Sequence, residues 1–272
     1  QIVKGMNYMS DETPNKFSLV DMPDSIDNAV KNLTDVPTKN VGQTFGDLWY
    51  LVFGGITHAA DKRRMKYAAD LEKFHQELTE SIDKIPDDKK VAPSIQTTAQ
   101  ALENSKYCVS SESLRNMFTK LISGTMNKDY EPLIHPSFPE MIKQMSENDA
   151  HILMELKRKA HNVPVAEFRE VLEENSRHIT HFTNAYISDI FRLSLDECSC
   201  TLSSLERMGL ISISYESRIS NDSLYKPFYE TVKYVSLKRD LAIFHRNSTL
   251  TLNKGICSIT PLGKRFIATC VS

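Results

Sequence analysis

The tract that follows Ser194 most constrains the fold, because a helix there must end at a glycine and pass directly into a strand. Ser194 stands before an acidic first turn and is a typical N-cap, since its hydroxyl can accept from N–H groups that the helix leaves unpaired. Gly209 supplies the left-handed conformation that closes helices. Ile211 and Ile213 alternate with serines, which is typical of a half-buried strand. The tract therefore predicts a helix that ends at Gly209 and a strand that begins at Ile211.

The end of the chain adds a second strand pattern and a closing helix. Leucines alternate with threonines from Thr249, and Asn253-Lys254-Gly255 has the chemistry of a hairpin turn. Thr260-Pro261 is an N-cap with proline at the first helical position. A long stretch separates the two strand patterns, and its apolar spacing predicts an inserted helix within 225–244. Helix, strand, hairpin and closing helix predict a winged-helix-like α+β module over residues 191–272.

The preceding part of the chain is short of strand and turn signals and predicts a helical body over residues 41–190. The whole sequence holds only 9 glycines, and long stretches contain no breaker. Residues 42–84 have the pattern of one long helix with a kink at Gly54-Gly55. Apolar residues recur at helical spacing after Ser111, and Ser146 begins another helix with a capping-box pattern. The predicted fold class is mainly α, with the α+β module at the C-terminus.

Residues 1–40 are polar and are expected to form an arm with one short helix. The longest uncharged apolar-rich run, Leu48–Ala60, is shorter than the ~20 residues that a membrane-spanning helix needs. No apolar stretch of a secretory leader stands at the start of the sequence. The five cysteines are irregularly placed and do not form a disulfide framework, which favours a reducing cytoplasm.

The charge distribution gives the first set of candidate contact residues. The formal net charge of −2 argues against a protein that binds nucleic acid over most of its surface. Residues 201–272, however, carry 10 Lys/Arg against 5 Asp/Glu. Cations on the predicted helices and at the predicted hairpin tip could contact phosphates. These candidates are Arg207, Lys254, Lys264 and Arg265. The alternative is that they only keep a small module in solution.

A second set of candidates joins an aromatic stretch to a basic one. These residues are Trp49, Phe53, Lys62, Arg63 and Arg64. An aromatic segment next to a basic one could contact a membrane interface or a partner protein. The alternative is that the aromatic stripe is core and the charges mark its solvent edge.

The sequence contains no motif of a known chemistry. Phosphate-binding glycine loops, dinucleotide fingerprints and the nucleophile elbow are all absent from it. His178 and His181 are three residues apart and could share a helix face, where a third ligand such as Glu173, Glu174 or Cys198 would complete a metal site. Two surface histidines are the favoured alternative. We therefore predict no catalytic residue, no metal and no cofactor, and a role in binding.

Four stretches of the sequence resemble the abortive infection alpha family. They are SLRNMFTKLISGTMN, HPSFPEMIKQMSENDAHIL, LSSLERMGLI and ITPLGKRFI, and the likeness extends over roughly residues 40–272. This bacterial family is associated with phage resistance and has no established catalytic residues. The resemblance implies a cytoplasmic bacterial defence protein.

Three hypotheses for the molecular role follow. In the first, the C-terminal module binds nucleic acid or a phage or host protein, while the helical body transmits the signal or forms a homo-oligomer. In the second, residues 45–66 become exposed and perturb a membrane. In the third, the chain is a winged-helix transcriptional regulator. Leakage of liposomes would distinguish the second from the first, and salt-dependent binding to DNA or RNA would support the first.

Overall fold

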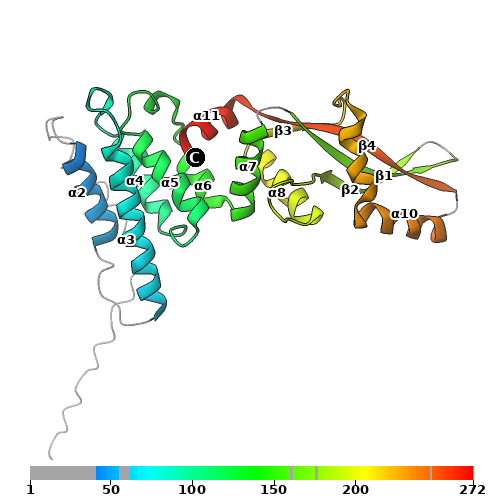
Figure 1. The fold of residues 1–272 in the computed structure, drawn as a ribbon, viewed down its shortest axis with the longest axis horizontal. Coiled ribbons are helices and arrows are strands. Elements are labelled where there is room, and N and C mark those ends of the chain that lie inside the picture. The colour runs from blue at the N-terminus through cyan, green and yellow to red at the C-terminus, as the bar shows by residue number, and fades with distance from the viewer. Residues whose placement is uncertain (1–40, 55–61, 160–161, 175–176, 246, 272) are drawn as a thin grey trace, which may run out of the picture. The chain divides into compact units, whose positions relative to one another are not determined.

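Helices and one antiparallel sheet make up the part of the chain that the structure describes (Figure 1). The computed structural model describes residues 41–54, 62–159, 162–174, 177–245 and 247–271, so the predicted arm lies outside it. The α-helices are α2 (Val41–Phe53), α3 (Lys62–Asp83), α4 (Ile95–Ser105), α5 (Glu112–Gly124), α6 (Phe138–Gln144), α7 (Glu147–Lys159), α8 (Leu195–Arg207), α9 (Lys226–Glu230), α10 (Val232–Phe244) and α11 (Pro261–Cys270). The strands are β1 (Val163–Leu172), β2 (His178–Ala185), β3 (Ile211–Ser214) and β4 (Ser248–Ile259). Short 3-10 helices are η2 (Asp87–Lys89), η3 (Glu131–Leu133) and η4 (Asp222–Tyr225).

The helices before β1 confirm the predicted mainly helical body. The apolar face of α5 is buried, and α7 begins with the predicted cap. The hydroxyl of Ser146 accepts from the N–H of Asp149 at 3.2 Å, and the carboxylate of Asp149 accepts from the N–H of Ser146 at 2.8 Å. The stretch predicted as one helix over 42–84 contains two helices, α2 and α3, and residues 55–61 between them lie outside the described part. No helix of the described residues is both long and apolar enough to cross a membrane.

The sheet has the order β2-β1-β4-β3, and all of its pairs are antiparallel. Strands β1 and β2 lie within the range that was predicted to be a helical body, and the division near residue 190 stays a prediction. The predicted hairpin at Asn253-Lys254-Gly255 is wrong, because β4 runs through these residues as one continuous strand. All three pair with β1, with Lys254 opposite Ala166. A full strand partner therefore holds this turn sequence in an extended conformation.

The helix ends of the C-terminal part confirm the local predictions. Ser194 and Glu197 form a capping box at the start of α8. Gly209 has φ +73°, the left-handed conformation expected after this helix. The hydroxyl of Thr260 accepts from the N–H of Gly263 at 2.9 Å and caps α11. The predicted insertion between the strands contains two helices, α9 and α10.

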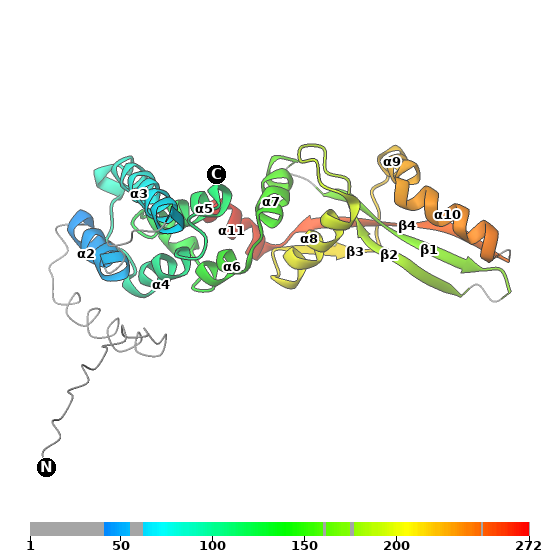
Figure 2. The ribbon, with the colours of Figure 1, turned by 90° about the horizontal axis from the view of Figure 1, so that it is seen from below.

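Two contacts place the C-terminal elements. Helix α10 packs against β4 and covers one face of the sheet, where Phe168, Tyr234 and Leu241 belong to one buried cluster (Figure 2). Helix α11 instead packs against α5. The carbonyl of Val271 accepts from Lys157 at 2.8 Å and also from Lys120, so α5 and α7 both hold the end of α11.

Candidate functional site

Among the residues that the structure describes, most of one edge of β4 has no neighbouring strand. Strand β4 has 12 residues and pairs with β1 along Ser248 to Cys257. Strand β3 has only 4 residues and pairs with β4 from Ile256 to Ile259. On the side away from β1, the rest of β4 is therefore an open sheet edge. A row of backbone N–H and C=O groups at such an edge can pair with another extended chain.

The backbone of Leu252 faces this open edge. The N–H of Thr260 donates to Leu210 at 3.0 Å, on the β3 side, and alternate residues of a strand present their backbone to the same neighbour. Counting back in steps of two, Leu252 presents its N–H and C=O to the open side. The Leu250 carbonyl faces the same side and accepts from the hydroxyl of Tyr234 at 3.2 Å. The Gly255 carbonyl, which accepts from the hydroxyl of Tyr225 at 2.8 Å, belongs to the alternate set that faces β1. The backbone of Leu252 therefore lies on the open side, next to the carbonyl that Tyr234 caps.

The edge is open because the chain leaves the sheet at Tyr215. The ring of Tyr215 lies over Gly255, where an added Cβ would be 2.5 Å from its Cδ1 atom. The hydroxyl of Tyr215 accepts from the N–H of Asn184 at 3.0 Å and donates to Oδ1 of the same residue at 2.9 Å. Burial raises the pKa of Tyr215 to about 12, so its hydroxyl stays protonated and can donate. Because Gly255 has no side chain, the ring of Tyr215 can lie over it, and β3 ends at the preceding residue.

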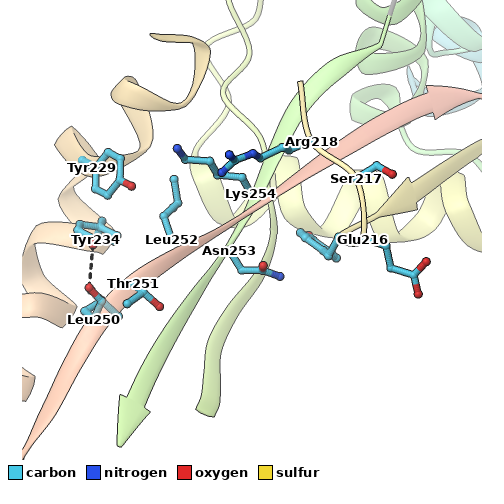
Figure 3. A pocket seen from close by; sticks show the side chains of 11 residues that line it. Glu216, Ser217, Arg218, Tyr229, Tyr234, Leu250, Thr251, Leu252, Asn253 and Lys254 are labelled. Atoms are coloured by element: carbon cyan, nitrogen blue, oxygen red, sulfur yellow. Dashed lines mark hydrogen bonds between the residues drawn. The ribbon is translucent and has the colours of Figure 1, made fainter. Parts of the chain in front are cut away.

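A pocket of ≈ 510 Å³ lies along the open edge. Its lining comes from β4, from the loop after β3 and from the helices α9 and α10, and consists of Tyr215, Glu216, Ser217, Arg218, Tyr229, Tyr234, Leu250, Thr251, Leu252, Asn253 and Lys254. Figure 3 shows Arg218, Leu252 and Lys254 on one side of β4 and Asn253 on the other. The ring of Tyr229 is 42% exposed and is available to a ligand. The pocket thus joins backbone hydrogen-bonding groups to an aromatic ring and two cations.

The two cations of the pocket differ in their partners. Lys254 forms an ion pair with Asp222 at 3.0 Å, and its Nζ lies 5.5 Å from the ring centroid of Tyr225. The hydrogen bond from Lys254, with smaller contributions from the charges of Lys254 and Arg218, lowers the pKa of Asp222. Arg218 is exposed and forms no ion pair with any described residue. Arg218 is therefore the cation of this pocket that a ligand can pair with.

The structure does not bring the four predicted phosphate contacts together. Lys254 lines the pocket from the middle of β4, not from a hairpin tip. Arg207 is the last residue of α8, whereas Lys264 and Arg265 are exposed on α11. Sequence reasoning did not identify Arg218 and Tyr229. They lie beside β4 only because of the path that the chain takes from the end of β3 to α9.

The second set of predicted contacts lies on α2 and α3. Phe53 is buried, and the ring of Trp49 lies 4.3 Å from Phe53 and 5.7 Å from Phe74 of α3. The two aromatic side chains therefore contribute to the packing of α2 on α3. Lys62, Arg63 and Arg64 belong to the first turn of α3, and their side chains lie outside the described part.

The two histidines that were placed on a helix lie on strand β2, which corrects that interpretation. Nε2 of His181 lies 2.8 Å from the buried carboxylate of Glu170, and Nδ1 of His245 lies 2.8 Å from its other oxygen. Burial alone would raise the pKa of Glu170, but hydrogen bonds from Ser248 and the two imidazoles outweigh it and lower the pKa to about 2. The described residues contain no group of three side chains that could hold a metal ion.

The structure is that of a mainly helical protein with a small antiparallel sheet and a pocket at the edge of that sheet. The chain belongs to the abortive infection alpha family, whose model matches residues 66–270. The matched range contains all of the sheet and the pocket, and it associates the chain with abortive infection. No curated protein and no solved structure shows significant similarity to the chain.

Proposed function

We propose that the chain is a cytoplasmic bacterial protein that acts in phage defence by binding a protein partner. In this proposal an extended segment of the partner adds as a strand to the open edge of β4. The observation that carries the proposal is the backbone of Leu252, which faces the pocket on the side of β4 that no described strand pairs, next to the Leu250 carbonyl that the Tyr234 hydroxyl caps. Strand addition uses such backbone groups for affinity and neighbouring side-chain pockets for specificity.

The charges at the pocket favour a peptide over a phosphate backbone. Binding of nucleic acid depends on cations that can neutralise phosphates, but Lys254 is already paired with Asp222. Glu216 also lines the pocket and would repel phosphates. Arg218 suits one acidic side chain, and the exposed ring of Tyr229 suits an apolar or aromatic one. We therefore expect a segment that alternates apolar and acidic residues.

The first test uses peptides selected from a displayed random library against the full chain. We expect Tyr229→Ala and Arg218→Glu each to weaken binding of the selected peptides at least about tenfold, because both side chains would contact them directly. Fluorescence polarisation of a labelled peptide measures the dissociation constants. Arg207→Glu is the matched control, since it reverses an arginine outside the pocket. Equal weakening by Arg218→Glu and Arg207→Glu would show that only net charge matters.

A second measurement identifies strand pairing itself. In a paired strand, alternate residues present their N–H groups to the neighbour, so N-methylation of the peptide should block binding at every second position only. A peptide that tolerates methylation throughout would not bind as a strand.

DNA or RNA binding through a winged-helix-like C-terminal module is the competing function. It is supported by the order α8, β3, β4 and α11, although α9 and α10 lie between the two strands. Salt-dependent binding to nucleic acid that is lost on charge reversal of Lys254, Lys264 and Arg265, without peptide binding at the pocket, would support that function instead.

A further inference from the structure

Helix α10 has two apolar faces, and the described part of the chain covers only one of them. Tyr234 and Leu241 are buried against the sheet. The other face exposes three apolar side chains, which are Val232 (86% exposed), Val235 (54%) and Ile243 (57%). A surface helix of a soluble domain ordinarily carries polar residues opposite its buried stripe. The outward face of α10 is therefore built for contact with something apolar.

Cations interrupt and flank this outward face. Val235, Arg239 and Ile243 follow one another at intervals of four, so they form one row on the helix. The side chain of Arg239 is 72% exposed, and that of Lys238 next to it is exposed and has no ion-pair partner among the described residues. Asp240 is the only acid of α10, and it lies 3.5 Å from Arg239. The outward surface of α10 is thus apolar with a net positive charge.

We infer that the outward face of α10 is a docking surface for an anionic lipid bilayer. A helix that lies in the plane of a membrane interface carries apolar side chains toward the acyl chains and Lys or Arg toward the head groups. The long stems of Lys238 and Arg239 let their charges reach head-group phosphates while Val232, Val235 and Ile243 enter the interface. Such docking requires no membrane-spanning helix.

The charge of α10 also argues against a second copy of the chain as the occupant. Two α10 faces packed antiparallel about a twofold axis would pair each residue with its mirror position in the helix. Arg239 stands close to the middle of Val232–Phe244, so the two guanidinium groups would meet near the axis. Like charges at such a position are destabilising. An anionic surface, in contrast, pairs with both cations.

Sedimentation of the full chain with lipid vesicles tests this inference. We expect binding to vesicles of phosphatidylcholine and phosphatidylglycerol in equal parts, and none to phosphatidylcholine alone. Neutralising both cations in the variant Lys238→Gln/Arg239→Gln should lower the partition coefficient about 30-fold. Ile243→Ser should lower it as well, because it removes the largest apolar side chain of the face. Tyr107→Ser is the matched control, since Tyr107 is also exposed, at 65%, and lies outside α10.

Circular dichroism spectra identical to that of the unchanged chain establish that the variants are folded. Absence of binding to the anionic vesicles would overturn the inference, and an apolar protein partner would then be the better occupant. Equal losses for Ile243→Ser and Tyr107→Ser would also overturn it, since they would place the contact elsewhere. None of these outcomes depends on peptide binding at the β4 edge.

Discussion

Replacing Gly263 by alanine should lower the free energy of unfolding by about 3 kcal/mol, in spite of the higher helix propensity of alanine. A Cβ at Gly263 would lie 2.0 Å from the carbonyl oxygen of Leu210, far inside van der Waals contact. That oxygen is held in place, because the N–H of Thr260 donates to it at 3.0 Å. Relief therefore requires α11 to move away from the turn between α8 and β3, and the cap of α11 would be lost with it.

The same substitution at Gly46 is the control. Gly46 lies within α2, and nothing is found within 4 Å of its added Cβ. Alanine there should raise the free energy of unfolding by up to about 1 kcal/mol, because glycine is the poorer helix former. Urea unfolding monitored by circular dichroism measures both changes in the free energy of unfolding, as long as the m-value is the same for all three proteins. A Gly263→Ala protein as stable as the unchanged chain would contradict the close contact.

The elements that the sequence predicts well are those whose signals are local. Ser194, Gly209 and Thr260 act on backbone groups within a few residues of themselves, so the sequence around each one contains nearly all the information required. The helices of the body are predicted for the same reason, since the period of their apolar residues decides which face is buried.

Strands β1 and β2 could not be predicted in this way, because distant residues satisfy their buried polar groups. Glu167 accepts from Asn253 at 2.9 Å, and Glu170 accepts from His245. Read alone, two acids and an arginine between apolar residues of β1 resemble the solvent face of a helix. When β1 is not predicted, the stretch Asn253-Lys254-Gly255 has no predicted strand partner. Its residue types then favour a turn, and the prediction is wrong.

The candidate site was predicted in part only. Lys254 was predicted to be a contact residue at a hairpin tip. It does line the pocket, but from the middle of strand β4. The open edge exists because β3 is short, and β3 is short because Tyr215 crosses Gly255 to reach Asn184. Contacts between residues this far apart in the chain leave no periodic signal.

Replacing Glu170 by alanine should cost about 3 kcal/mol of stability at neutral pH. The Glu170 side chain is fully buried, and its two oxygens accept from His181 and His245, each at 2.8 Å. An ionised carboxylate can only accept, so both imidazoles donate to it and would lose their acceptor in the variant. Glu174→Ala is the control, because Glu174 is exposed in the turn after β1. Urea unfolding should show little change for the control.

The variant Glu170→Gln separates the charge of Glu170 from its volume. The folded state holds the pKa of Glu170 at about 2, below its ordinary value of 4.5. A carboxyl with a depressed pKa stabilises the fold fully above the unfolded value and loses this contribution as pH falls through the folded value. The unchanged chain should therefore exceed Glu170→Gln in stability at neutral pH, and the difference should shrink as pH falls from 4.5 toward 2. A difference that stays constant over this window would mean that Glu170 stabilises the sheet by packing alone, without help from its charge.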